Sequence, residues 1–342
     1  MNALPLAIST GDPAGVGPEV SLRAAAGACG SDRFVLFGDA RALRARARAL
    51  GIDPARVIEL PGSAATDLPP GGIGLVDCGV AWAGAAERHE ATAEGGAAQL
   101  AALDLASRAA LEGHARALVT APMSKAAVQL AGHDFTGHTE HLARAAGLAD
   151  DAVTMMFLGP KLRVALATTH VAVARLPAAV TRARVLRAIV HLGQAVLRLS
   201  PRSGAARHIV VTGLNPHAGE AGLFGDEEPC VIAPAIAEAQ RLPPFRDQRV
   251  RLSGPIGAET AFRQAASGEI DAVVAMAHDQ ATIASKLLDW TLAVNVTWGL
   301  PFVRTSVDHG VAYDAARAGT ADARGMVSAI EMAQRLTSRE HE

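Results

Sequence analysis

The chain has 342 residues, of which 50% are hydrophobic and 19% are charged, and its formal net charge at pH 7 is -2. This length exceeds the size at which single hydrophobic cores usually stop growing, so two domains are expected. The near-neutral balance of charge gives no electrostatic basis for binding nucleic acid or an anionic membrane surface.

Cysteine usage and the amino terminus indicate a cytoplasmic protein. Cys29, Cys78 and Cys230 are odd in number and far apart, with no CxxC pair or zinc-ligand spacing, so we expect reduced thiols. The first residues lack the charged head and long apolar run of a signal peptide, and later apolar runs are too short to span a membrane. We therefore expect no membrane partner.

Short β-rich runs alternate with Ala- and Leu-rich stretches along the chain. A first apolar run ends at Ser9-Thr10-Gly11-Asp12, which is typical of a strand entering a turn. The clearest later strands are predicted at 34–37, 117–120, 163–167, 208–211 and 272–276, and the clearest helices at 96–111, 182–199, 230–241 and 323–335. Strands that are apolar on both faces and alternate with helices predict an α/β fold with a mostly parallel sheet.

A glycine-rich segment, Gly11–Glu19, follows the predicted first strand and precedes a helix. Its spacing is not GxGxxG, and Pro13 does not suit that turn, so a Rossmann dinucleotide site is rejected. Pro18 fits near the first helical position, which favours a tight strand-to-helix turn. The segment is also compatible with a rim loop over a nucleotide or substrate.

Three histidines, His170, His217 and His278, each follow a predicted central strand. Ligands of open α/β sheets bind at the carboxyl ends of the strands, so the three side chains should project into one rim. Three imidazoles with open positions suit a catalytic divalent metal, which would bind a substrate hydroxyl and lower its pKa. The alternative is that each is a hydrogen-bonded histidine near a strand end.

A second set of residues suits an anion: His138, Thr139, Lys286, Asn295 and Arg304. Arginine offers a planar fork for carboxylate or phosphate, and lysine a point charge. Arg304 follows the apolar run 296–303, so it is expected to have a partner or a ligand.

Together these segments resemble the 4-hydroxythreonine-4-phosphate dehydrogenase (PdxA) family of pyridoxal phosphate biosynthesis. The matching stretches run in order from the first strand to the last helix, at 11–19, 135–140, 168–170, 213–220, 275–280 and 299–310. The Asn-Pro-His segment at 215–217 and the Arg-Thr-Ser-Val-Asp-His-Gly segment at 304–310 are long enough to be highly specific.

The resemblance implies an isocitrate/isopropylmalate-dehydrogenase-like fold, with two α/β domains and a cleft between them. Residues 1–130 and 300–342 would form the first domain, and residues 131–299 the second, with the metal and substrate residues at the interdomain cleft. It also implies a homodimer whose active sites use residues of both subunits.

The resemblance assigns a role to each candidate residue. His170, His217 and His278 would be the metal ligands, and the anion set would bind the substrate. The segment Asp308–Asp314 is similar to the loop that holds the adenine end of NAD in the wider fold. The expected cofactor-binding residues are Gly11, Asp12, Asp308, His309, Gly310 and Asp314.

The implied reaction is oxidation of 4-phosphohydroxy-L-threonine by NAD or NADP, with decarboxylation to 3-amino-2-oxopropyl phosphate. Zinc best suits imidazole ligands, while magnesium, manganese or cobalt are alternatives. The general base is left open between Lys125 and a metal-bound hydroxide. Asp279, next to a metal ligand, is a second catalytic candidate or only orients that ligand.

Several residues depart from the family pattern. Gly257 and Glu259 replace the usual Pro and Asp of one loop, and Ala281–Ser285 differs after His278. Leu223 stands at a position that is often polar in the family, and Arg317 stands at a position that is usually Gly. Some of these features resemble relatives that oxidise a terephthalate-derived cis-dihydrodiol dicarboxylate, and other relatives take four-carbon sugar-acid phosphates. A catabolic dehydrogenase is therefore the main alternative.

Two further alternatives come from other functional classes. One is a phosphate-binding protein that kept the fold and lost catalysis, against which the intact histidines and anion set argue. The other is a metal-dependent acyl or phosphoryl transferase, which the absence of a Walker-type loop makes remote.

Overall fold

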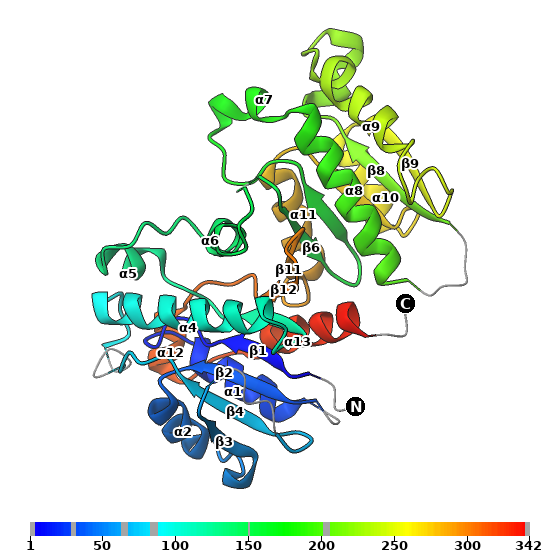
Figure 1. The fold of residues 1–342 in the computed structure, drawn as a ribbon. Helices are drawn as coiled ribbons and strands as arrows, with labels where there is room; N and C mark the ends of the chain where they lie inside the picture. Colours follow the sequence, from blue (N-terminus) through cyan, green and yellow to red (C-terminus); the bar gives the residue numbers. More distant parts are fainter. Residues whose placement is uncertain are drawn as a thin grey trace. The chain divides into compact units, whose positions relative to one another are not determined.

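The computed structural model describes residues 4–28, 32–62, 68–82, 88–149, 151–200 and 206–338. The chain divides into two compact units. The first comprises Met1–Asp150 and Leu300–Thr337, and the second is built on Asp151–Gly299. Figure 1 shows the chain coloured along the sequence.

The first unit is built on a parallel sheet. Its strand order is β3 (Val57–Leu60), β4 (Ile73–Asp77), β2 (Phe34–Gly38), β1 (Leu6–Ser9), β5 (Ala117–Thr120) and β12 (Val303–Ser306). Each neighbouring pair in this order is parallel. In β1, β5 and β12 the last residues stand in register, Ser9 opposite Thr120 and Thr120 opposite Ser306. The loops that follow these three strands therefore leave from one edge of the sheet.

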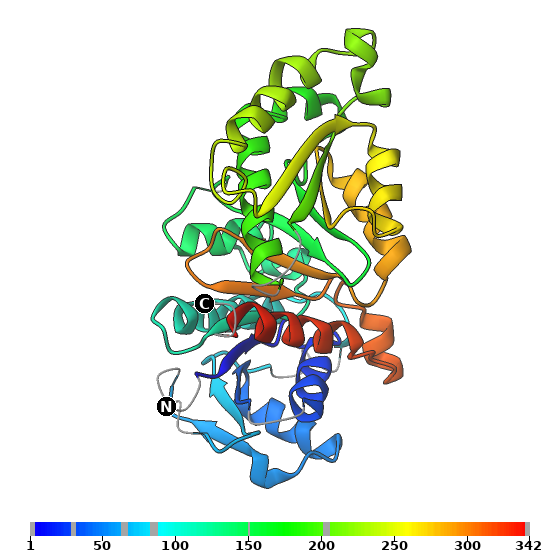
Figure 2. The same ribbon diagram turned by 90° about the vertical axis from the view of Figure 1, so that its right-hand side faces the viewer.

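Helices cover both faces of this sheet. The helices are α1 (Gly17–Gly27), α2 (Ala40–Ala49), η1 (Pro54–Arg56), α4 (Ala93–Leu111), α5 (Lys125–Leu130), α6 (His138–Ala145), α12 (Tyr313–Ala318) and α13 (Arg324–Thr337). Helix α4 packs on β1, β2 and β5, while α13 packs on β5 and β12 beside α1. Figure 2 shows α13 running alongside the strands.

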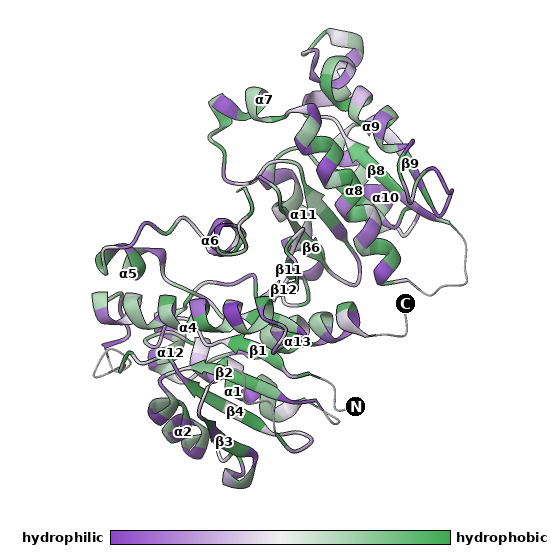
Figure 3. Ribbon diagram, in the orientation of Figure 1, coloured by the Kyte–Doolittle hydropathy of each residue, from purple (hydrophilic) through white to green (hydrophobic). Residues whose placement is uncertain are grey.

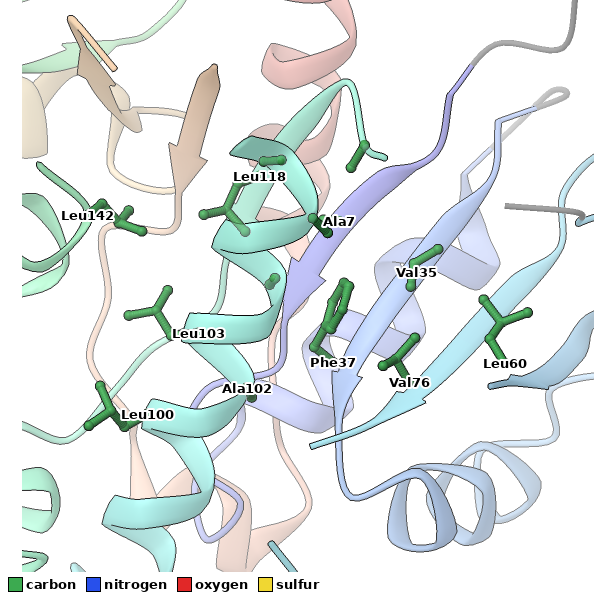
Figure 4. Packing of buried hydrophobic residues seen from close by; sticks show 14 of the residues in the cluster. Ala7, Val35, Phe37, Leu60, Val76, Leu100, Ala102, Leu103, Leu118 and Leu142 are labelled. Atoms are coloured by element: carbon green, nitrogen blue, oxygen red, sulfur yellow. The ribbon is translucent and has the colours of Figure 1, made fainter. Parts of the chain in front are cut away.

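The core of the first unit lies between α4 and the strands. Phe37 of β2, Leu103 of α4 and Leu118 of β5 are fully buried members of one cluster, and all three are labelled in Figure 4. Phe135 and Leu142 belong to the same cluster. Because these apolar side chains pack there, residues 131–149 lie in the first unit, whereas the sequence prediction assigned residues 131–299 to the second domain.

The second unit has a mixed sheet in the order β11 (Val294–Trp298), β6 (Thr154–Leu158), β7 (Arg163–Leu166), β10 (Ala272–Ala275), β8 (Arg207–Thr212) and β9 (Val250–Ile256). Strand β6 is antiparallel to both of its neighbours. Strands β7, β10, β8 and β9 are parallel. The predicted α/β fold with a mostly parallel sheet is confirmed.

Helices again flank the strands. They are η2 (Val173–Arg175), α7 (Leu176–Ala179), α8 (Arg182–Arg198), η3 (Pro216–Gly222), η4 (Glu228–Ile232), α9 (Ala233–Ala239), α10 (Ala258–Ala266) and α11 (His278–Asp289). Helix α8 packs on β6, β7, β8 and β10 beside α9, and α10 and α11 also pack on the sheet and on each other. Figure 2 shows the two pairs on opposite sides of the strands. In Figure 3 the strands are mostly hydrophobic, whereas the helices carry hydrophilic residues as well.

No helix among the described residues is long and apolar enough to cross a membrane. Cys78 and Cys230 are free thiols, as expected, while Cys29 lies outside the described residues.

A half-buried histidine of α8, His191, packs at the ends of β6 and β11. Its Nδ1 lies 2.8 Å from the Thr154 hydroxyl. A Cβ on Gly299, whose φ is +103°, would lie 2.9 Å from the His191 ring, so only glycine fits this close approach. Burial lowers the pKa of His191 to about 4, and the charge of Arg187 adds to this effect.

His191 is therefore expected to make folding sensitive to acid. Its folded pKa of about 4 lies below the unfolded value near 6.5, so the neutral imidazole stabilises the fold above that unfolded value. As the pH falls from about 6.5 to 4, protonation of the unfolded His191 should lower the free energy of unfolding by roughly 3 kcal/mol. Thermal unfolding measured against pH should show this loss in the parent protein, and His191→Gln should flatten it. An equal flattening by His133→Gln, at an exposed site, would contradict the assignment.

Candidate functional site

The second unit brings the three predicted metal-ligand histidines to one edge of its sheet. His170 follows β7, His278 begins α11 after β10, and His217 follows β8. Strands β7, β10 and β8 are adjacent and parallel. Their carboxyl ends therefore face the same rim, as the sequence predicted.

His170 and His278 form a close pair. Their ring centroids lie 5.3 Å apart. The Asp279 carboxylate lies 2.7 Å from Nδ1 of His278, so Nε2 is the ring nitrogen that this contact does not use. On the other side, the Thr168 hydroxyl donates to the Met276 carbonyl at 2.6 Å and so ties the His170 segment to β10. The Asp279 side chain is 83% exposed and contacts the His278 ring. This favours the interpretation that Asp279 orients His278.

His217 lies in a left-handed segment. Its φ is +52°, and positive φ values continue without a break through Gly222. Four of these six residues are not glycine, and each such residue costs about 1–2 kcal/mol in the left-handed region. Backbone strain of this kind persists only where surrounding contacts enforce it, and it is common at functional sites.

The spacing of the His170 and His278 rings fits a shared metal ion. With Zn–N bonds of about 2.0–2.1 Å and tetrahedral angles, two imidazoles on one ion have centroids roughly 5 Å apart. The observed 5.3 Å therefore suits a shared divalent ion. The described residues contain no group of three His, Cys, Asp or Glu side chains already gathered for a metal. His217 instead lies near Phe224, with ring centroids 6.3 Å apart.

Glu259, one of the departures noted in the sequence, lies close to His217. The pKa of its exposed carboxyl is lowered mainly by the hydrogen bond from the Thr260 hydroxyl at 2.7 Å, and also by the charge of His217. Gly257 accommodates this side chain, because a Cβ there would lie 2.6 Å from the Glu259 carboxylate. The two departures thus form one local feature beside a predicted metal ligand.

The first unit contains a buried cation. Arg304 of β12 is 2% exposed, and its guanidinium donates to the Thr120 hydroxyl at 2.7 Å. Burial lowers the pKa of Arg304 to about 9, which still leaves the group charged at neutral pH, and the charge of Glu140 acts in the opposite direction. A buried guanidinium is costly unless anions and hydrogen bonds compensate it. The expectation that Arg304 has a partner is confirmed.

His138 lies near this guanidinium, and Lys125 lies near His138. Burial lowers the pKa of His138 well below its usual value, and the charges of Arg304, His141 and Lys125 lower it further. His138 is therefore neutral at pH 7. Its Nε2 is buried and makes no hydrogen bond within the described part of the chain. An acidic hydroxyl or a phosphate oxygen is the kind of ligand that this nitrogen and the neighbouring cations would bind.

The predicted cofactor residues follow β1 and β12 at the common carboxyl edge. Gly11, with φ of +71°, is required there because a Cβ would lie 2.2 Å from the Pro122 carbonyl oxygen. The Asp12 carboxylate is buried and accepts from Tyr313 at 2.7 Å and from the Ala14 amide at 2.9 Å. Burial raises the pKa of Asp12. This carboxylate therefore shapes the loop, whereas His309, Gly310 and Asp314 are exposed.

Two members of the predicted anion set belong to the second unit. Lys286 is exposed on α11, with Nζ 6.0 Å from the centroid of the Trp290 ring. Asn295 lies on β11, where its Oδ1 is buried without a hydrogen-bond partner among the described residues. His138, Thr139 and Arg304 lie in the first unit, so the predicted set is divided between the units.

A family model for the pyridoxal phosphate biosynthetic protein PdxA matches residues 31–333. The chain belongs to the PdxA family. A 4-hydroxythreonine-4-phosphate dehydrogenase of Geobacter metallireducens is 41% identical over 97% of this chain and 95% of its own length. A D-threonate 4-phosphate dehydrogenase of Salmonella typhimurium is 39% identical over 98% of this chain and 100% of its own length.

Solved structures of PdxA proteins share the fold. The 4-hydroxythreonine-4-phosphate dehydrogenase of Klebsiella pneumoniae has a TM-score of 0.80 at 36% identity, covering 98% of this chain and 100% of that one. A terephthalate 1,2-cis-dihydrodiol dehydrogenase of Burkholderia xenovorans has a TM-score of 0.67 at 29% identity, covering 97% and 98%. The isocitrate dehydrogenase of Methylococcus capsulatus matches at a TM-score of 0.51 and 13% identity, covering 97% and 85%, which confirms the predicted fold class. The PdxA relatives are dehydrogenases, so this chain is an oxidoreductase.

Three contributors to the site were not singled out by the sequence. Tyr313 holds Asp12, Glu228 holds the loop before His217, and Gln280 donates to the Gly213 carbonyl at 3.2 Å. Each contact joins residues that are 14 or more positions apart, so local spacing gave no signal. The one local cue for Glu228 is the Gly-Asp-Glu-Glu sequence at 225–228, which by itself indicates only a flexible loop.

Arg304→Lys should weaken anion binding to the first unit. Lysine keeps the charge but loses the planar fork and the hydrogen bond to Thr120, so affinity for inorganic phosphate should fall about tenfold. Phosphorus NMR titration of the purified protein would measure this affinity. Arg41→Lys on the exposed side of α2 is the matched control. Equal affinities in the parent and Arg304→Lys would rule out Arg304 as an anion ligand.

Proposed function

We propose that this PdxA-family protein oxidises 4-phosphohydroxy-L-threonine with NAD or NADP and a divalent metal, releasing carbon dioxide and 3-amino-2-oxopropyl phosphate. The observation that carries the proposal is the buried Arg304 guanidinium, with neutral His138 near it and Lys125 near His138. This arrangement suits a phosphate ester better than a neutral alcohol. The 41% identical relative named for this activity supports the same substrate.

The residues of the second unit supply the oxidation site in this proposal. His170 and His278 would hold the divalent metal, with His217 as the third ligand and zinc as the best-suited ion. When bound, such an ion lowers the pKa of a substrate hydroxyl and stabilises negative charge on oxygen. Asp279 fixes the His278 ring by its 2.7 Å contact. The exposed residues His309, Gly310 and Asp314 would contact the nicotinamide cofactor.

Lys125 is our candidate for the proton acceptor. It begins α5, and its Nζ would lie 3.7 Å from a Cβ placed on Gly137, the residue before His138. This places its amine beside the His138 end of the proposed anion site. Two electrons and the hydrogen on the alcohol carbon pass to the nicotinamide as hydride, while the hydroxyl proton leaves through this base.

A second candidate is the dehydrogenation of D-threonate 4-phosphate or a related four-carbon acid phosphate. The relative at 39% identity is named for that substrate. The departures Gly257 and Glu259 lie near the proposed metal ligand His217, so they are the residues by which this chain would differ from the usual family pattern at the substrate. Both candidate substrates carry a phosphate ester and an alcohol that is oxidised, and they differ in the group on the second carbon.

NADH formation with zinc, magnesium or cobalt decides between these substrates. We expect the highest kcat/KM for 4-phosphohydroxythreonine. A preference for D-threonate 4-phosphate would indicate a catabolic role and would still support the proposed phosphate site. A preference for a terephthalate-derived cis-diol acid would contradict the phosphate site. No turnover of any of the three would support a phosphate-binding protein without catalysis.

We also propose that the protein is a homodimer with shared active sites. Helix α11 exposes Ile283, Leu287 and Trp290, which are 61%, 81% and 73% exposed and spaced along one helical face. Leu292 continues this apolar surface at 48% exposure. A contiguous apolar face of this kind usually marks an interaction surface, and α11 also carries His278 and Lys286.

Leu287→Glu should therefore convert the dimer into monomers, because it places a charge in the centre of the apolar face. Light scattering after gel filtration would measure the mass, and dehydrogenase activity should fall with the dimer fraction. Leu111→Glu at the exposed end of α4 is the control. A parent protein that runs as a monomer at micromolar concentration would refute the proposed dimer.

A further inference from the structure

The segment that carries His217 has an unusual backbone. All six residues from His217 to Gly222 have positive φ, and the four that are not glycine are His217, Ala218, Glu220 and Ala221. L-residues leave this conformation readily unless other contacts hold them. The orientation of the His217 ring therefore depends on what fixes the ends of the segment.

Glu228 occupies the inside of this loop. It is 3% exposed, at the start of η4. Its Oε1 accepts hydrogen bonds from the backbone amides of Leu214 and Asn215, both at 2.8 Å. Its Oε2 accepts from the Asn215 side-chain amide at 3.0 Å. One carboxylate thus binds three donors in the two residues that precede Pro216.

The loop is also shaped around this carboxylate. A Cβ on Gly213 would lie 2.9 Å from Oε1, and a Cβ on Gly219 would lie 2.7 Å from Oε2. Gly219 is inside the left-handed segment, so Glu228 contacts both the entry to the segment and its middle. The hydrogen bonds lower the pKa of Glu228 against the effect of burial, so the carboxylate is ionised at neutral pH.

A second link joins the same loop to His278. The Gln280 side-chain oxygen accepts from the amides of Met276 and Ala277, both at 3.0 Å, and its nitrogen donates to the Gly213 carbonyl. Gln280 lies two residues after His278. A displacement of the loop at Gly213 would therefore disturb the hydrogen bond to Gln280 at the start of α11.

We propose that Glu228 is the positioning residue for His217: its buried carboxylate holds Leu214, Asn215 and the left-handed segment, so that the imidazole stays at the strand-end rim where His170 and His278 would hold a divalent ion. This inference rests on the proposed function for the identity of the bound ion. Glu228 itself touches neither substrate nor metal. Glu228 holds the His217 ring in place before the divalent ion binds. The free energy of binding is therefore not spent on ordering residues 214–222.

Glu228→Gln is the decisive variant. Glutamine keeps the volume and can accept from both backbone amides, but its NH₂ group then faces the NH₂ group of Asn215. We expect zinc affinity of the metal-stripped full-length protein to fall about tenfold to a hundredfold in calorimetry, as is typical when a partner that orients a metal ligand is lost. Hydrogen exchange at residues 214–222 should become faster.

Glu238→Gln on α9 is the matched control, because it removes an exposed ion pair with Arg182 without touching the loop. Unchanged zinc affinity in folded Glu228→Gln, with or without faster exchange, would overturn the positioning role. If Glu228→Gln does not fold, Asn215→Ala removes only the side-chain donor. That variant should weaken zinc binding severalfold, and an unchanged affinity would overturn the proposal equally.

The two levels of the proposal fail in different ways. A parent protein that does not bind zinc, magnesium or cobalt would refute the metal part of the proposed function. In that case unchanged hydrogen exchange in Glu228→Gln or Asn215→Ala would also refute the role of Glu228 in holding the loop. A parent protein that binds zinc but does not reduce NAD would refute the dehydrogenase assignment alone.

Discussion

Parallel strand pairing is the constraint on which both candidate sites depend. Because parallel neighbours all end at the same edge of a sheet, residues far apart in sequence are brought to one rim. In the second unit this brings His170 and His278, from the ends of β7 and β10, to a centroid separation of 5.3 Å. In the first unit the same geometry joins the loops after β1, β5 and β12.

The two units use this edge for different chemistry. The first unit gathers positive charge around a buried guanidinium, and burial strengthens the interaction of that charge with any anion that replaces water. The second unit carries His170, His217 and His278 at the ends of adjacent parallel strands, and imidazole nitrogens are suited to binding a metal. The proposed oxidation of a phosphorylated alcohol would use a cation to hold the phosphate and a metal to polarise the hydroxyl.

Buried polar groups fix the loops on which these sites depend. Asp12 and Tyr313 join the loops after β1 and β12, and Glu228 gathers the loop after β8. In each case a carboxylate with little exposure has its oxygens satisfied by several donors, which offsets the cost of burying it. Groups satisfied in this way give the loops single conformations. The left-handed segment at His217 is the place where that restraint matters most, because its backbone conformation is costly.

Much of this protein could be predicted from the sequence because the signals were local. Apolar runs predicted β2, β5, β7, β8 and β10, and alternation with helices gave the α/β class. Motifs at strand ends identified the family. Only the tertiary structure decided that residues 131–149 join the first unit, since that depends on Leu142 packing against a core formed elsewhere. The same is true of Glu228, whose three donors lie 13 or 14 residues away and are brought to it by the fold of the loop. Local sequence determines which residues can bind, whereas long-range packing decides how they are held.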